Sequence, residues 1–102
     1  MSHYKSDLRD IEFNLFEVFG VRERLGKGAF ADMDEDTARS ILTEVERLAV
    51  GPLSESFVDA DRHPPVYDPA TYSVTVPESL KTAFRALMDS GYWALDLPPH
   101  LG

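Results

Sequence analysis

Residues 34–49 read DEDTARSILTEVERLA and form the strongest helical pattern of the chain. Apolar side chains recur there at steps of three and four residues, the spacing that aligns one face of an α-helix. These positions are Ala38, Ile41, Leu42, Val45, Leu48 and Ala49. The acidic residues Asp34, Glu35 and Asp36 come first, where the positive end of a helix dipole stabilises negative charge. The stretch predicts an amphipathic helix that begins at this acidic cluster.

The segment before it, residues 7–19, is predicted to form a shorter amphipathic helix. Its apolar residues follow the same spacing, Ser6 is a candidate N-cap, and Gly20 supplies a C-terminal stop. Phe13 and Phe16 widen the apolar surface beyond a single stripe, so this helix is expected to contact two neighbours.

Two more helical segments are predicted after the long helix. Gly51-Pro52 breaks or kinks the helical path, and apolar residues continue the pattern to about Asp61. Pro77 suits the first turn of a last helix, which Gly91 ends. The segment 92–97 that follows is apolar and is expected to be buried by a neighbour.

A small β-hairpin is predicted between these two segments. Val66-Tyr67 and residues 73–76 have β-forming side chains, and Asp68-Pro69 between them is typical of a turn. The expected fold is therefore mostly α, a small helical domain of about four helices with a minor β-hairpin near residues 66–76. A lone hairpin is marginal in water and needs a supporting surface.

The charge balance disfavours some classes of partner. The chain has 10 Lys and Arg against 18 Asp and Glu, a net charge of −8. Residues 1–51 hold 7 basic and 11 acidic groups and residues 52–102 hold 3 and 7, so each half carries −4. Because nucleic-acid affinity depends largely on clustered Lys and Arg, nucleic acid is disfavoured as a partner, as is an anionic membrane.

The expected location is the cytoplasm. The N-terminus lacks the apolar core of an export signal, and no window approaches the roughly 20 apolar residues of a transmembrane helix. The chain contains no cysteine, so disulfides, thiolate zinc sites and a cysteine nucleophile are excluded.

Residues 25–30, LGKGAF, share only their glycines with a phosphate-binding loop. A P-loop needs Ser or Thr after its Gly-Lys pair, where Gly28 stands, and a kinase-type loop needs a third glycine, where Ala31 stands. The better interpretation is a flexible connector over residues 20–35.

An alternating acidic run resembles the start of a calcium loop. Asp32, Asp34 and Asp36 have the spacing of its first ligands. However, Thr37 replaces the glycine that turns such a loop, and Thr43 replaces the bidentate glutamate that closes it. A charged helix N-terminus explains the run better.

The chain also lacks a recognisable catalytic or metal-binding constellation. Asp59, Asp61 and His63 alternate, which would suit a divalent metal, but they stand at a helix end before two prolines. His3, His63 and His100 have no obvious serine and acid partners, and no Gly-x-Ser-x-Gly elbow occurs. We assign no catalytic, cofactor-binding or metal-ligating residue.

Several motifs resemble one bacterial branch of the acyl-CoA dehydrogenase family. The opening segments Tyr4–Asp10 and Phe13–Glu17 resemble the N-terminal extension of that branch. Asp61–Pro69, Val76–Phe84 and Met88–Leu95 resemble the helical N-terminal domain that follows it. The resemblance covers essentially the whole chain and predicts an extension at 1–33 and part of the helical domain at 34–102.

The resemblance implies an enzyme of fatty acid β-oxidation that dehydrogenates acyl-CoA thioesters between the α- and β-carbons. In the family, FAD lies between the middle and C-terminal domains and across a subunit interface. A glutamate beyond the N-terminal domain removes the α-proton while flavin N5 accepts hydride. These elements do not map onto residues 1–102, so FAD is expected in the full-length enzyme and not in this segment, which alone is expected to be inactive.

After Leu97-Pro98 the family continues with two acidic residues, an aromatic residue and two glycines, whereas this chain has Pro99-His100-Leu101-Gly102. We therefore expect a fragment or truncated product whose partners are the remaining domains of the same enzyme or a homo-oligomer. The helix at 78–90 and the segment 91–97 are expected to help wall the acyl-chain pocket. The alternative is a stand-alone acidic helical module that binds another protein.

Overall fold

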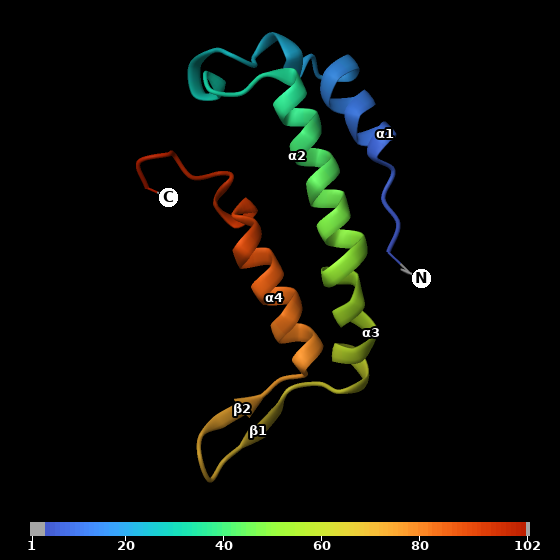
Figure 1. Ribbon diagram of the computed structural model, residues 1–102, viewed down its shortest axis with the longest axis vertical. Coiled ribbons are helices and arrows are strands. Elements are labelled where there is room, and N and C mark those ends of the chain that lie inside the picture. Colours follow the sequence, from blue (N-terminus) through green and yellow to red (C-terminus); the bar gives the residue numbers. More distant parts are fainter. Residues whose placement is uncertain (1–3, 102) are drawn as a thin grey trace. The chain divides into compact units, whose positions relative to one another are not determined.

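Helices make up most of the chain in the computed structural model, which describes residues 4–101 (Figure 1). A two-stranded antiparallel sheet is added to them, which confirms the predicted fold class. The chain divides into two units. Lys5–Arg47 forms one, and residues 48–101 form the main part of the other. Each unit is described by itself.

The first unit begins with α1 (Leu8–Glu12), and a π-helical stretch, Phe13–Val18, prolongs it. The predicted helix is therefore present, but its N-cap is Asp7 and not Ser6. The Asp7 carboxylate accepts a hydrogen bond from the Asp10 backbone N–H at 3.2 Å. The Ser6 hydroxyl instead donates to the Glu46 carboxylate at 2.7 Å, a long-range partner that local sequence does not reveal.

The connector after α1 is built from short turns, as its glycines predict. It contains 3-10 turns at Val21–Glu23 and Gly28–Phe30. Gly26 and Gly28 have φ angles of 77° and 54°, which side chains with a Cβ rarely adopt. The Gly26 N–H donates to the Phe30 carbonyl at 2.9 Å, so the loop closes on itself.

The long predicted helix is α2 (Glu35–Leu48). Asp34 caps its start, because its carboxylate accepts a hydrogen bond from the Thr37 N–H at 2.7 Å. This bond holds the pKa of Asp34 below its ordinary value. The acidic run at 34–36 therefore has the helix-starting role that the sequence indicated.

The second unit starts with a kinked helical path. Ala49–Leu53 is a π-helical stretch in which Gly51 leaves helical geometry, with φ −95° and ψ −108°. Helix α3 (Ser54–Arg62) follows directly. The kink lies at the predicted Gly51-Pro52 pair, since proline cannot donate a backbone hydrogen bond and crowds the preceding turn.

The predicted hairpin is also present. Strand β1 (Val66–Asp68) pairs antiparallel with β2 (Ser73–Thr75), with Tyr67 opposite Val74. The Asp68 carboxylate accepts a hydrogen bond from the Ala70 N–H at 2.9 Å and closes the turn. All residues of both strands are exposed, so within this structure the hairpin has no supporting surface.

Helix α4 (Glu78–Ser90) packs against α3, and Gly91 ends it with φ 76°. Three small residues on these helices are buried: Ala83 exposes 3% of its surface, and Ser54 and Ser56 expose 7% each. A 3-10 turn, Tyr92–Ala94, follows α4. Within the residues described the expected burial of segment 92–97 is not found, because Trp93 remains 53% exposed.

Within residues 4–101, no helix is long and apolar enough to cross a lipid bilayer.

Candidate functional site

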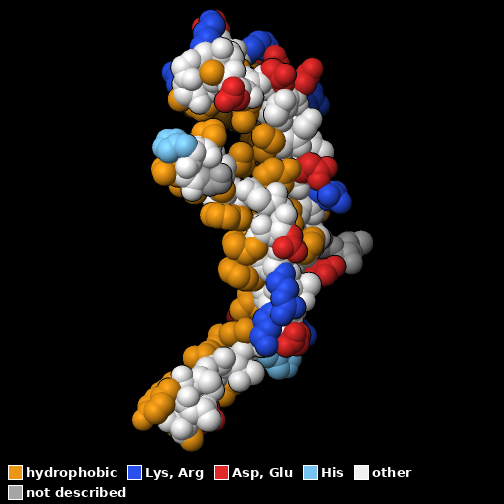
Figure 2. All heavy atoms as spheres, turned by 60° about the vertical axis from the view of Figure 1, so that its left-hand side comes forward, with side chains coloured by type: hydrophobic (Ala, Val, Ile, Leu, Met, Phe, Trp, Pro, Cys, Tyr) orange, Lys and Arg blue, Asp and Glu red, His pale blue; other side chains and the backbone are white. Residues whose placement is uncertain are grey.

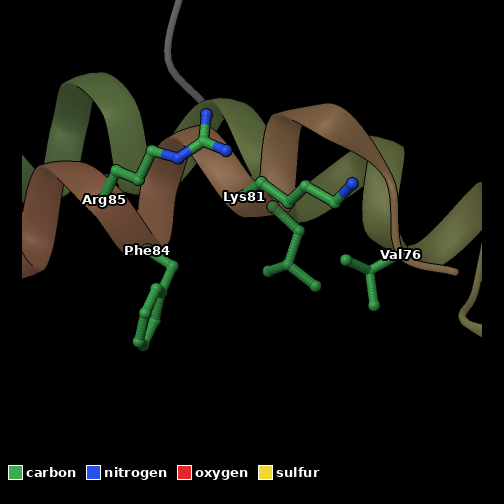
Figure 3. Close-up of a pocket in the computed structure, with 5 residues that line it drawn as sticks. Val76, Lys81, Phe84 and Arg85 are labelled. Carbon is green, nitrogen blue, oxygen red and sulfur yellow. The ribbon is translucent and has the colours of Figure 1, made fainter. Parts of the chain in front are cut away.

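An open apolar groove lies along α4 in the second unit. Val76, Leu80 and Phe84 line it, together with Lys81 and Arg85, around a volume of about 450 Å³. Leu80 and Phe84 are four residues apart on α4, which brings their side chains to one side of the helix, and Val76 lies just before the helix begins at Glu78. Figure 3 shows Val76 and Phe84 pointing the same way, with Lys81 and Arg85 beside them.

The two cations at the groove differ in their partners. Lys81 Nζ lies 3.0 Å from a carboxylate oxygen of Glu78, one turn earlier on α4. That hydrogen bond, with the charge of Lys81, lowers the pKa of Glu78. Arg85 is exposed and has no carboxylate within ion-pair distance among residues 4–101. The groove is thus apolar along its length with one unpaired cation at its border.

A second hollow lies just after α4. Its volume is about 400 Å³, and the residues that line it belong to the segment from Ser90 to Pro99, Tyr92, Leu95 and Leu97 among them. Leu95 and Leu97 expose 49% and 40% of their surface. Figure 2 shows hydrophobic side chains gathered along the surface of α4 and over the hairpin. The parts expected to wall an acyl pocket, 78–90 and 91–97, therefore both carry open apolar surface.

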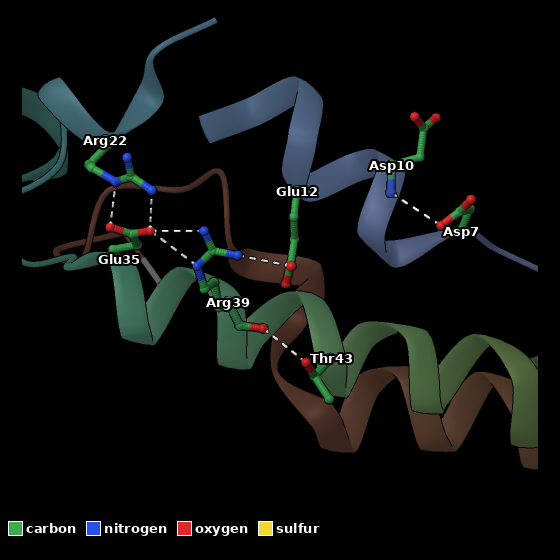
Figure 4. A network of polar contacts seen from close by, with 7 residues as sticks. All are labelled: Asp7, Asp10, Glu12, Arg22, Glu35, Arg39 and Thr43. Atoms are coloured by element: carbon green, nitrogen blue, oxygen red, sulfur yellow. Dashed lines mark hydrogen bonds and ion pairs between the residues drawn. The ribbon is translucent and has the colours of Figure 1, made fainter. Parts of the chain in front are cut away.

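In the first unit the prominent feature is a network of charged side chains (Figure 4). Arg22 donates two hydrogen bonds to the Glu35 carboxylate, at 2.7 and 2.8 Å. Arg39 donates to the same carboxylate at 2.9 Å and to Glu12 at 2.9 Å. The Arg39 guanidinium also lies 4.2 Å from the centre of the Phe16 ring, which exposes 4% of its surface. The network thus joins α1, the connector and α2 over one buried aromatic ring.

The electrostatic consequence is strongest at Glu35. Hydrogen bonds from Arg22 and then Arg39 lower the pKa of its carboxyl from 4.5 to about 2. The same contact with Glu35 raises the pKa of Arg22. All four charges are matched by partners, so this arrangement holds the fold together and offers no free acid or base.

Asp59, Asp61 and His63 at the end of α3 were weighed as metal ligands, and the structure brings Asp59 and His63 together. Asp59 Oδ1 lies 3.0 Å from His63 Nδ1, and Asp59 Oδ2 accepts a hydrogen bond from the Ser79 hydroxyl. These bonds, that from Ser79 first, lower the pKa of Asp59. Asp61 is not part of the cluster, and no trio of His, Asp or Glu within the described residues is placed to hold a metal ion. The cluster ties α3 to the start of α4.

Some of these contacts were within reach of sequence reasoning and others were not. Glu35–Arg39 and Asp59–His63 are four residues apart on a helix, a spacing that predicts side-chain pairing. Arg22–Glu35, Arg39–Glu12 and Ser79–Asp59 join separate elements. The spacing of these residues in the sequence does not predict those pairs, because they depend on how the elements pack.

A comparison of the sequence with known proteins shows which class of protein the chain resembles. Over its whole length the chain is similar to an acyl-CoA dehydrogenase, as its motifs indicated. That relative is the broad-specificity linear acyl-CoA dehydrogenase FadE5 of Mycobacterium tuberculosis, which is 54% identical over 102 residues. The aligned part is 100% of this chain and 17% of the relative. No protein-family model matches the chain.

Proposed function

We propose that residues 1–102 are the N-terminal part of an FAD-dependent acyl-CoA dehydrogenase that acts on acyl-CoA thioesters in the cytoplasm. The observation that carries this proposal is the 54% identity across the whole chain to a dehydrogenase about six times as long. The mostly helical fold supports it. The boundary expected between an extension at 1–33 and a helical domain at 34–102 is part of this proposal.

We propose that FAD is bound by other parts of the enzyme and not by this segment alone. Ligand sites in proteins usually bury 70–90% or more of a drug-sized molecule. The two hollows of the second unit are open, and each is walled by one short stretch of chain, residues 76–85 or 90–99. A dinucleotide would remain largely in solvent there. The flavin and the catalytic base are therefore proposed to come from other parts of the enzyme.

The role proposed for this segment is structural support of the acyl-chain pocket. Helix α4 and the segment 91–97 present exposed apolar side chains, among them Phe84 and Leu95. The α3–α4 contact and the bond from Ser79 to Asp59 hold that helix in place.

The test is purification of the product of the native locus through a tag placed ahead of Ser2. We expect a product several times heavier than 11.4 kDa, yellow from bound flavin, whose colour is bleached anaerobically by palmitoyl-CoA. A colourless product of about 11.4 kDa would contradict the proposal and favour the stand-alone interaction module.

A further inference from the structure

Helix α4 begins without a cap from its own part of the chain. The first turn of an α-helix leaves backbone N–H groups without helical partners, and a carboxylate beside that turn is stabilising. Helix α1 has Asp7 in this place and α2 has Asp34, and each accepts a backbone hydrogen bond. Before α4 stands Pro77, whose side chain makes no such bond. The carboxylate of Glu78 pairs with Lys81 instead, on a side chain that is 79% exposed.

A carboxylate from α3 lies at this first turn. The hydroxyl of Ser79, the second residue of α4, donates a hydrogen bond to Asp59 Oδ2. Asp59 Oδ1 lies 3.0 Å from His63 Nδ1, so both carboxylate oxygens have a partner. The bond from Ser79 and then that from His63 lower the pKa of Asp59, which favours its charged form. Asp59 thus brings to the start of α4 the negative charge that Asp7 and Asp34 bring to their own helices.

The bond from Ser79 spans the hairpin. It joins residues twenty positions apart, and the chain between α3 and α4 passes through β1 and β2 (Figure 1). All residues of both strands are exposed, so within the described residues the hairpin has no supporting surface. The bond therefore holds the start of α4 to α3 more directly than the connecting chain does.

The same bond fixes the rotation of α4 about its axis. Ser79 bonds to α3, and Ala83, four residues later, lies on the same side of the helix and exposes 3% of its surface. Leu80 and Phe84 each follow by one residue, which places them about 100° further round the helix. They line the apolar groove. A rotation of α4 that broke the bond from Ser79 would turn Leu80 and Phe84 away from their present direction.

We propose that Asp59 is a positioning residue of the enzyme: through Ser79 it fixes the start and the rotation of α4, and so sets how tightly long acyl chains bind. The inference rests on the proposed function, in which α4 helps wall the acyl-chain pocket. A long acyl chain would reach Leu80 and Phe84, and a short one would not. Asp59 contacts neither substrate nor flavin in this role, so its effect falls on binding and not on the chemical step.

The experiment measures kcat and KM of the tagged product of the native locus with palmitoyl-CoA and with butyryl-CoA. Asp59→Ala and Ser79→Ala should each raise KM for palmitoyl-CoA about fivefold and leave kcat unchanged, because a partly exposed hydrogen bond to a charged group is lost. KM for butyryl-CoA should not change. Hydrogen exchange in the first turn of α4 should become faster in the same variants.

Three further variants tie the effect to this one bond. Asp59→Asn keeps an acceptor for the Ser79 hydroxyl and should restore most of the affinity for palmitoyl-CoA. The double variant with alanine at both positions should be no worse than either single variant, since each removes the same bond. Asp61→Ala is the matched control, because Asp61 is an exposed carboxylate of α3 outside this cluster, and it should change neither KM.

The other outcomes overturn the inference in distinguishable ways. A colourless product near 11.4 kDa overturns the proposed function and the positioning role together. A heavy, yellow enzyme that loses kcat equally with both substrates shows that the bond serves stability alone. A KM that is unchanged, raised equally for both substrates, or raised as much by Asp61→Ala overturns the positioning role. If Asp59→Ala does not fold, Ser79→Ala decides the question, because alanine is a good helix former.

Discussion

Phe16 in the first unit and Phe84 in the second lie in opposite surroundings, since they expose 4% and 61% of their surface. In Lys5–Arg47, Phe16 is buried beneath Arg39, whose guanidinium binds Glu12 and Glu35 at the same time. In residues 48–101, Phe84 stands exposed beside Arg85, which has no such partner among the described residues. A charged network can close over one ring within a short segment. An apolar helix face requires a second apolar surface of similar extent.

The largest effect is expected from a charge placed at Ala83, a buried residue of the second unit. Ala83→Asp should lower the free energy of unfolding by about 3 kcal/mol or more, because it places an unpaired carboxylate where 3% of the surface is exposed. Denaturant unfolding of the purified protein measures this change. Thr82→Asp, at the exposed neighbouring position, is the control and should have little effect. Equal losses for both would show that α4 is not packed at Ala83.

In the first unit, Arg39→Ala removes two ion pairs and the contact with Phe16. The expected loss is about 1–2 kcal/mol, since each contact is partly exposed. Arg47→Ala removes a single pair with Glu44 at a side chain that is 79% exposed, and its effect should be close to zero. Urea titration of both variants tests the network. A loss at Arg47 as large as that at Arg39 would contradict it.

The start of α2 gives a smaller effect. Asp34→Ala removes the cap on the Thr37 N–H and should cost about 1 kcal/mol, whereas Asp34→Asn keeps an acceptor and should cost less. Hydrogen exchange of the first turn of α2 reports the change locally. Unchanged exchange in the alanine variant would mean that the cap does not hold the turn.

The smallest expected effect is that of low pH on the contacts of Glu35 with Arg22 and Arg39. The pKa of Glu35 is lowered to about 2, so its contribution is complete above its ordinary value of 4.5 and is lost as the pH falls from 4.5 towards 2. NMR signals of α1 and α2 should follow that titration, and Glu35→Gln should flatten it. A Glu35 carboxyl that titrates near 4.5 would refute the proposed contacts with Arg22 and Arg39.

Much of the backbone was predictable from local pattern. The apolar spacing of residues 35–48, the kink at Gly51-Pro52, the turn at Asp68-Pro69 and the stop at Gly91 each depend on a few neighbouring residues. Propensity and backbone geometry act over that same range. The N-cap of α1 was predicted one residue early. The Ser6 hydroxyl donates a hydrogen bond to Glu46, forty positions away, and Asp7 caps the helix.

The sequence alone was sufficient for the mostly helical class, the hairpin and the resemblance to the acyl-CoA dehydrogenases, because periodicity, turn residues and motifs are properties of the chain itself. Packing had to be known before Arg39 could be placed over Phe16 or Ser79 against Asp59. It was equally needed to show that Phe84 and Trp93 remain exposed. A hydrophobic side chain has the same character in either setting, and its burial depends on what the rest of the fold brings beside it.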